Sequence, residues 1–117
     1  MAQITKRLLS GSTNGRGIKV AAIATPGTLL HTAVTGTADL DEIWIYAVNS
    51  SATDRLLTIE LGGVTDPDDQ VEFTLSAQDG LYLVIPGFVL NNAVVVRAFA
   101  AVANVIVCYG YVHRITA

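Results

Sequence analysis

Charged side chains are scarce in this chain. Only 15% of its 117 residues are Asp, Glu, Lys or Arg, whereas 51% are hydrophobic. An average soluble domain carries about 25% charged residues. The composition therefore excludes intrinsic disorder, which requires low hydrophobicity and high net charge. It also indicates more apolar surface than one small domain can bury, so we expect a protein that forms oligomers or binds a larger assembly.

Cysteines and long apolar runs are also lacking. The single cysteine, Cys108, excludes a disulfide framework within one chain. The most apolar stretch, residues 93–112, is interrupted by Arg97 and Asn104, so we expect no membrane span. Residues 1–15 contain no apolar core long enough for a signal peptide. We therefore expect a soluble chain that is made in the cytoplasm.

Short strands, rather than helices, are predicted along the sequence. Alternating, β-branched or aromatic residues indicate strands at 42–48, 56–61, 71–75, 81–85, 93–101 and 105–114, with shorter ones at 18–25 and 29–34. Turn signals such as Asp79-Gly80 and Pro86-Gly87 end them. Strands at this spacing predict an all-β antiparallel sandwich or barrel, for which the jelly roll is a natural topology.

Two of the predicted strands are apolar on both faces. In residues 105–114, Tyr109 and Tyr111 share one face, while Ile106 and Cys108 share the other. Such a strand is either central or covered by another subunit. Residues 42–48 place Trp44 and Tyr46 on one face and Ile43, Ile45 and Ala47 on the other. Core packing is the more frequent fate of an aromatic pair, whereas an exposed pair binds a sugar or a partner chain.

Positive charge is concentrated at the beginning of the chain. Lys6, Arg7, Arg16 and Lys19 precede all ten acidic residues, and the formal net charge is −3. We expect residues 1–17, which include a Gly/Ser-rich stretch, to form a flexible basic arm on a single β-sandwich domain of residues 18–117. No aromatic residue lies among the four cations to stack on bases, so contact with a partner protein is favoured over nucleic acid.

An acidic segment and a glycine-rich segment are the candidates for binding chemistry. Asp66, Asp68, Asp69 and Glu72 form a cluster that is best explained as a solvated turn, with a weak calcium site or contact with a basic partner as alternatives. Residues 11–17 lack the lysine and the spacing of a phosphate-binding loop.

The two histidines and the single cysteine are the candidates for catalysis. His31 and His113 stand at no metal-ligand spacing. Cys108 and His113 would lie on opposite faces of one strand, about 16 Å apart. We therefore predict no enzymatic activity and no cofactor.

The chain resembles the capsid decoration (cement) proteins of tailed bacteriophages. The resemblance lies in the basic arm of residues 1–17, in the all-β body, and in the stretches DEIWIYAVN (residues 41–49) and LVIPGFVLN (residues 83–91). It implies a structural protein without catalytic residues that forms trimers on the virion surface, binds the major capsid protein and clamps adjacent capsomers. Neither nucleic acid nor a membrane is an implied partner. The partner-binding residues that we predict are Lys6, Arg7, Arg16, Lys19, Trp44, Asp66, Asp68 and Asp69.

Two other functions are compatible with the same fold. A carbohydrate-binding β-sandwich module of a phage tail or adhesion device would use Trp44 or Tyr82 as a stacking platform. A small enzyme on a jelly-roll scaffold, such as a cupin, would need histidines and carboxylates clustered inside the barrel. The positions of the two histidines disfavour this enzyme.

Overall fold

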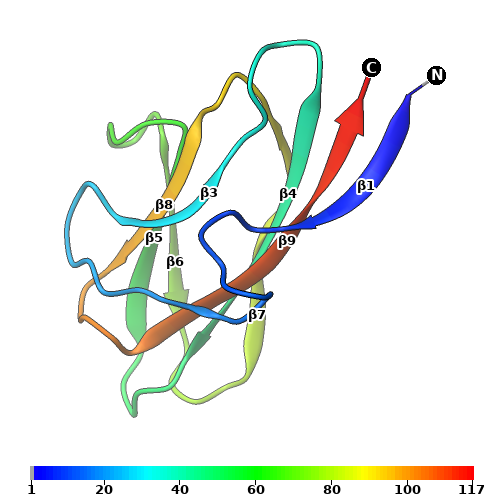
Figure 1. Cartoon of the computed structure of the whole chain (residues 1–117). Helices are drawn as coiled ribbons and strands as arrows, with labels where there is room; N and C mark the ends of the chain where they lie inside the picture. The colour runs from blue at the N-terminus through cyan, green and yellow to red at the C-terminus, as the bar shows by residue number, and fades with distance from the viewer. Residues whose placement is uncertain (1) are drawn as a thin grey trace.

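The computed structural model describes residues 2–117, and Met1 lies outside the described residues (Figure 1). Regular structure in this range consists of strands, which confirms the expected all-β class. The strands are β1 (Gln3–Leu8), β2 (Ile18–Lys19), β3 (Thr28–Thr32), β4 (Leu40–Asn49), β5 (Arg55–Leu61), β6 (Gln70–Leu75), β7 (Leu81–Leu90), β8 (Val95–Ala100) and β9 (Ile106–Thr116).

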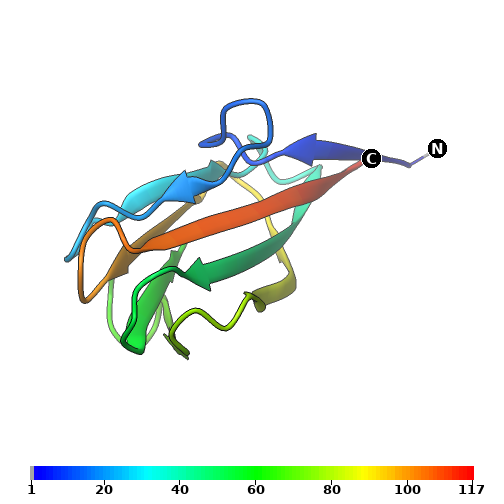
Figure 2. The ribbon, with the colours of Figure 1, turned by 90° about the horizontal axis from the view of Figure 1, so that it is seen from below.

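The strands form two antiparallel sheets that pack together as a β-sandwich. One sheet has the order β1-β9-β4-β7, with β2 also paired to β9, and the other has the order β3-β8-β5-β6. The pairs are nested along the chain, since β2 pairs with β9, β3 with β8, β4 with β7 and β5 with β6. The chain is thus arranged like one long hairpin wound around a common core. Near the two ends of the chain, Gln3 of β1 pairs with Thr116 of β9, and the two strands run side by side (Figure 2).

The core lies between the inner faces of the two sheets. In β4, Ile43 and Ile45 are fully buried, whereas Trp44 and Tyr46, which alternate with them, are only partly buried. This alternation is the period-two pattern of a strand with one face toward the core. Burying one side chain of this size contributes about 1.5–3 kcal/mol to folding. The core is therefore built by the aliphatic face of β4, and the aromatic pair lies on the outside of the sandwich.

β7 extends beyond its predicted end. The sequence predicts a strand that stops at Pro86-Gly87, but β7 continues to Leu90. β7 is an edge strand that pairs only with β4. Pro86, which has no N–H to donate, therefore interrupts no hydrogen bonds to a second neighbouring strand. The register against β4 shifts between Ile43 and Trp44, and Gly87 has a φ of 81° there. The dipeptide that signals a turn thus forms a β-bulge within the strand.

Residues 2–17, which belong to the segment expected to form an arm, include a strand that pairs with the sandwich. Gln3–Leu8 form β1, which pairs with β9 in register from Thr116 to Tyr111. Leu9 is buried in the core, and the Gly11 N–H donates to the Leu30 carbonyl at 2.9 Å. The backbone of an extended segment gains hydrogen bonds by adding to the open edge of β9, which explains why this stretch is ordered within the fold.

Candidate interaction surface

The outward side of the β1-β9-β4-β7 sheet is unusually apolar. Its register places Trp44 opposite Tyr111, Tyr46 opposite Tyr109, and Leu83 opposite Tyr46. We call this side the outer face. Its apolar members are Ile4, Leu8, Leu40, Trp44, Tyr46, Val48, Leu81, Leu83, Val89, Val107, Tyr109, Tyr111 and Ile115.

Much of the outer face is exposed to solvent. Within residues 2–117, eleven large hydrophobic side chains are exposed, and six of them lie on this face. They are Ile4, Leu8, Leu81, Leu83, Val89 and Tyr109, with exposed fractions from 41% to 69%. Soluble monomers rarely expose a contiguous apolar patch of this kind, and such patches mark protein or ligand contacts.

Aromatic rings occupy the centre of the outer face. The rings of Trp44 and Tyr111 are stacked, with centroids 6.4 Å apart and planes inclined by 16°. Tyr111 also contacts His113, with ring centroids 5.3 Å apart. Gly87 allows this arrangement, because a Cβ at that position would crowd the Trp44 ring. The β-bulge and its glycine therefore make room for the tryptophan.

The ionisable groups at the centre of the outer face contact its aromatic rings. Glu42 accepts a hydrogen bond from Trp44 Nε1 at 2.8 Å. It also accepts one from His113 Nδ1 at 3.1 Å when Nδ1 carries the proton of the imidazole ring. The bonds from Trp44 and then His113 lower the pKa of Glu42. Lys6 Nζ lies 5.1 Å from the centroid of the Tyr111 ring, within cation–π range. The centre of the face therefore offers a partner an aromatic and aliphatic surface that also carries the ammonium group of Lys6.

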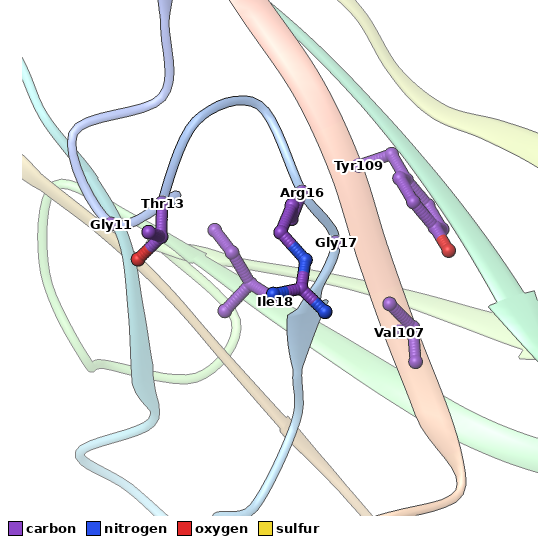
Figure 3. Close-up of a pocket in the computed structure, with 7 residues that line it drawn as sticks. All are labelled: Gly11, Thr13, Arg16, Gly17, Ile18, Val107 and Tyr109. Carbon is purple, nitrogen blue, oxygen red and sulfur yellow. The ribbon is translucent and has the colours of Figure 1, made fainter.

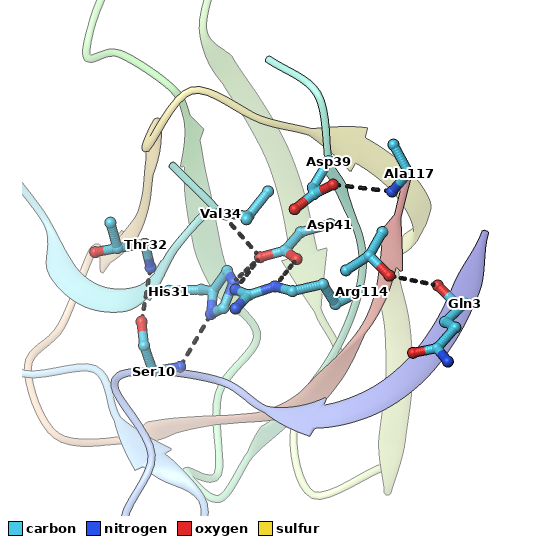
Figure 4. Close-up of polar contacts among 10 residues, drawn as sticks. Gln3, Ser10, His31, Thr32, Val34, Asp39, Asp41, Arg114 and Ala117 are labelled. Carbon is cyan, nitrogen blue, oxygen red and sulfur yellow. Dashed lines mark hydrogen bonds and ion pairs between the residues drawn. The ribbon is translucent and has the colours of Figure 1, made fainter. Parts of the chain in front are cut away.

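A second cluster, at one end of the sandwich, is polar and buried (Figure 4). Asp41 accepts from Arg114 Nε at 2.8 Å and from the Val34 N–H at 3.1 Å, and its Oδ2 lies 2.8 Å from His31 Nε2. Burial by itself would raise the pKa of Asp41, but the bonds from Arg114 and His31 outweigh it and lower this pKa. The bond to Asp41 raises the pKa of Arg114. The cluster is thus a paired and hydrogen-bonded charge inside the fold.

This cluster contains a serine, a histidine and an aspartate, the residue types of a serine hydrolase triad. The serine hydroxyl, however, does not bond to the histidine. The Ser10 backbone N–H donates to His31 Nδ1 at 2.9 Å, so neutral His31 carries its proton on Nε2, facing Asp41. The Ser10 hydroxyl instead accepts from the Thr32 N–H at 2.7 Å. A nucleophilic serine requires its hydroxyl, not its amide, on the imidazole. The cluster therefore fastens residues 9–12 to β3 and β4, a role for which the sequence contains no local signal.

A groove of about 380 Å³ lies beside the outer face (Figure 3). It is lined by Arg16 and Thr13 from the segment before β2, and by Val107 and Tyr109 from β9. Gly17 is required at its wall, because a Cβ there would overlap Val107 and the Tyr109 ring. The groove therefore places one of the predicted basic residues next to the exposed tyrosine.

The structure brings only some of the predicted partner-binding residues together. Lys6 and Trp44 both contact Tyr111, and Arg16 lies near Tyr109. Arg7 is on β1 and Lys19 is on β2. These cations form no ion pair within residues 2–117.

The acidic residues belong to a different part of the molecule. Asp66, Asp68 and Asp69 lie in the loop between β5 and β6, in the sheet that does not carry the outer face. The Asp69 carboxylate accepts from the Thr65 N–H at 3.1 Å and so stabilises its own turn. Among residues 2–117, no three His, Cys, Asp or Glu side chains gather where they could hold a metal ion.

Sequence reasoning missed the greater part of the outer face. It singled out Trp44, which shares one face of β4 with Glu42, whereas Tyr111 and His113 join them only through the pairing of β4 with β9. Tyr82, the other predicted stacking platform, packs against Phe73 with ring centroids 5.8 Å apart and donates its hydroxyl to Asp79. That last bond raises the pKa of Tyr82.

Comparison with known proteins found no relative of this chain. No family model matches the chain, and no curated protein or solved structure matches it either. No helix within residues 2–117 is long and apolar enough to cross a membrane. The chain is a β-sandwich with exposed apolar side chains on one outer face.

Proposed function

We propose that this chain is a structural assembly protein, specifically a capsid decoration (cement) protein of a tailed bacteriophage. It forms oligomers on the shell surface, binds the major capsid protein and clamps adjacent capsomers. The observation that carries this proposal is the outer face, where exposed aliphatic side chains surround a stacked aromatic centre. Aromatic residues at the centre of an apolar patch are the composition of protein–protein contact sites.

A clamp of this kind needs rigidity, contact area and many copies. The sandwich supplies a rigid body, and its nested strand pairing supports the jelly-roll topology that we propose with it. Each contact of standard size buries about 1,600 Å² in total, and symmetry multiplies its effect through avidity. The resemblance to decoration proteins implies a trimer as the repeating unit.

The basic residues near the N-terminus have a separate role in the proposal. Arg7, Arg16 and Lys19 carry no ion pair within residues 2–117, so their charges are available to acidic groups of the shell protein. Such contacts outside the apolar centre steer and orient association. The acidic loop at Asp68 would meet a basic shell surface in the same way.

The direct test is binding to purified shells that lack decoration proteins. We expect the protein to co-sediment with the shells and to saturate at a fixed number of copies per capsomer. Arg16→Glu should weaken binding, and the control Leu56→Glu, at an exposed position of the other sheet, should not. Asp68→Asn reports on the acidic loop, and unchanged affinity would identify that loop as an inert turn. Absence of any saturable binding to shells would contradict the proposal.

One observation favours carbohydrate binding as a second candidate. The stacked pair of Trp44 and Tyr111, with Glu42 and His113 beside it, combines a ring platform with hydrogen-bonding groups. A glycan array probed with the wild type and with Trp44→Ala separates the two functions. A glycan signal that Trp44→Ala abolishes supports the second candidate, and no glycan-dependent signal rejects it.

A further inference from the structure

We infer that β1 of one copy adds to the free edge of β6 in a neighbouring copy, so that three copies close a ring through this head-to-tail contact. Because it names the contact that forms the proposed oligomer, this assignment rests on the proposed function. Two uncovered strand edges, the charges that they carry and the register in which those charges meet support the contact. The outer face stays free to bind the shell.

Two strand edges of the sandwich are regular and uncovered. β1 ends one sheet and β6 ends the other, and among residues 2–117 no strand pairs with their second sides. The edge of β3 is covered, because Leu30 accepts from the Gly11 N–H and the Thr32 N–H donates to Ser10. The edge strand β7 carries Pro86 and two register shifts against β4, and β2 has only two residues. An uncovered regular edge is a template for pairing with another chain.

The free edge of β1 presents the backbone groups of its even-numbered residues. In the adjacent β9, the Ile106 carbonyl accepts from the Val20 N–H at 2.9 Å, on the side where β1 also pairs. Backbone bonds alternate between the two sides of a strand, so the even-numbered residues of β9 bond on that side. Their partners in β1 are odd-numbered, because the register pairs Arg7 with Val112. The outward N–H and C=O groups of β1 therefore belong to Ile4, Lys6 and Leu8.

The free edge of β6 is defined in the same way. The Leu61 N–H of β5 donates to the Asp69 carbonyl at 2.8 Å, immediately before β6 begins. The unbroken register of β5 and β6 then turns the backbone groups of Val71, Phe73 and Leu75 toward β5. The residues with outward backbone groups are therefore Gln70, Glu72 and Thr74.

The two free edges carry opposite charge. Lys6 and Arg7 are exposed on β1, and Glu72 is exposed on β6. Within residues 2–117, none of these three side chains forms an ion pair. Opposite charges directly across two strands stabilise their pairing, whereas like charges destabilise it. Centred pairing of β1 with itself would put Lys6 against Lys6, and that of β6 would put Glu72 against Glu72. Pairing between the two different edges is therefore favoured.

One antiparallel register matches all six residues of both strands. It places Lys6 opposite Glu72, with the outward backbone groups of the two strands facing one another. Opposite residues share a face of the joined sheet, so the ammonium group and the carboxylate meet on the same side. That side is the outside of both sandwiches, since Lys6 contacts Tyr111 on the outer face and Glu72 lies opposite the buried face of Leu75.

The positions of the two edges favour a ring. Ser10 and Gly11, directly after β1, bond to β3, whereas Phe73 of β6 packs against Tyr82 of β7. β1 and β6 therefore lie at opposite edges of the sandwich, and one chain cannot join its own two edges. A contact between two different surfaces repeats from copy to copy and closes when the rotation between copies allows it. In a ring of three, each copy makes the contact twice, and backbone hydrogen bonds supply affinity.

The first test reverses the two charges in the full-length chain. We expect Lys6→Glu and Glu72→Lys each to weaken self-association about 10-fold, because each places like charges across the contact. The double variant Lys6→Glu/Glu72→Lys should restore association, since it restores the ion pair. Ile23→Glu, at an exposed position outside all strands, is the control and should leave association unchanged. Mass is measured by light scattering over a range of concentrations, and circular dichroism checks folding.

The second test locates the contact by disulfide cross-linking. Ile4 and Thr74 are both exposed and lie opposite each other in this register. Such residues are about 5.5 Å apart at Cα, within the range that a disulfide spans. Oxidation should cross-link the double variant Ile4→Cys/Thr74→Cys into covalent trimers, whereas neither single variant should cross-link alone. The native Cys108 is buried and does not compete.

The mass and the cross-links decide the outcome. A wild-type trimer that both single charge reversals weaken and the double reversal restores supports the ring. A wild-type mass other than three chains, a trimer that lacks this response, or a covalent dimer of either single cysteine variant overturns it. Shell binding by the wild type is measured separately. A trimer that binds no shells rejects the proposed function alone, and a monomer that binds them rejects the ring alone.

Discussion

Asp41 and Arg114 lie opposite each other on β4 and β9 and share hydrogen bonds of 2.8 Å and 3.0 Å. The same carboxylate contacts His31 on β3, which belongs to the other sheet. Asp41 therefore joins the two sheets at one end of the sandwich, and His31 extends this link to the backbone of Ser10. A buried charge with this many partners stabilises one arrangement of the surrounding segments only while all partners are present.

Removing the charge of Asp41 should destabilise the fold. We expect Asp41→Asn to lower the free energy of unfolding by about 3 kcal/mol, because Arg114 would lose its buried carboxylate partner. Urea denaturation followed by circular dichroism measures this change. The exposed Asp68→Asn provides the control and should be nearly neutral. A neutral Asp41→Asn would show that the ion pair adds nothing to stability.

Acid should remove the stabilisation that Asp41 provides. Its pKa in the folded protein is lowered from an ordinary value of 3.8, so the folded state binds the proton less readily than the unfolded state. The contribution is therefore fully present above about pH 4 and is lost as the pH falls through the lowered pKa. Denaturation midpoints across this range should fall more steeply for the wild type than for Asp41→Asn. Parallel curves would contradict the assignment.

Gly110 should tolerate no larger side chain. A Cβ at this position would overlap the Trp44 carbonyl oxygen on the adjacent strand. Because that atom belongs to the backbone of the sheet, we expect Gly110→Ala to cost about 3 kcal/mol or more. Gly80→Ala is the control, since the space around Gly80 is open and only its φ of 81° opposes a side chain. Thermal unfolding of both variants should show the larger loss for Gly110→Ala.

The thiol of Cys108 should be inert in the folded protein. It is fully buried on the inner face of β9, and burial raises its pKa to about 12. Thiol reagents act on the thiolate, so labelling at neutral pH should require unfolding. We expect labelling to be slow in buffer and complete in denaturant, followed by mass spectrometry. Rapid labelling without denaturant would indicate local opening of β9.

The sequence predicted the positions of the central strands better than the turns and the long-range strand pairing. Local alternation located β4, β5, β6, β8 and β9 within a few residues, because a half-buried strand carries a period-two signal. The same signal failed at Pro86-Gly87, where a turn dipeptide became a bulge on an edge strand. It also failed at β1, whose only apolar residues are Ile4 and Leu8 and which pairs with residues more than a hundred positions away.

The candidate site was predictable only in part. Trp44 was identified from its strand, but Tyr111, His113 and Lys6 reach it through long-range pairing that leaves no trace in the local pattern. Core packing of the Trp44 and Tyr46 pair, the more frequent outcome, is not what the structure shows. Ile43 and Ile45 on the opposite face fill the core instead.

The amino-acid sequence by itself determined that this chain forms strands and that its apolar residues exceed the demand of one small core. Only the tertiary structure decided which apolar face was buried, because the two faces of β4 and β9 are alike in hydrophobicity and differ mainly in shape. Compact aliphatic side chains such as Ile45 fill the space between the sheets, and the larger Trp44 and Tyr109 remain outside. The pairing of distant strands then gathered these outward residues into one surface.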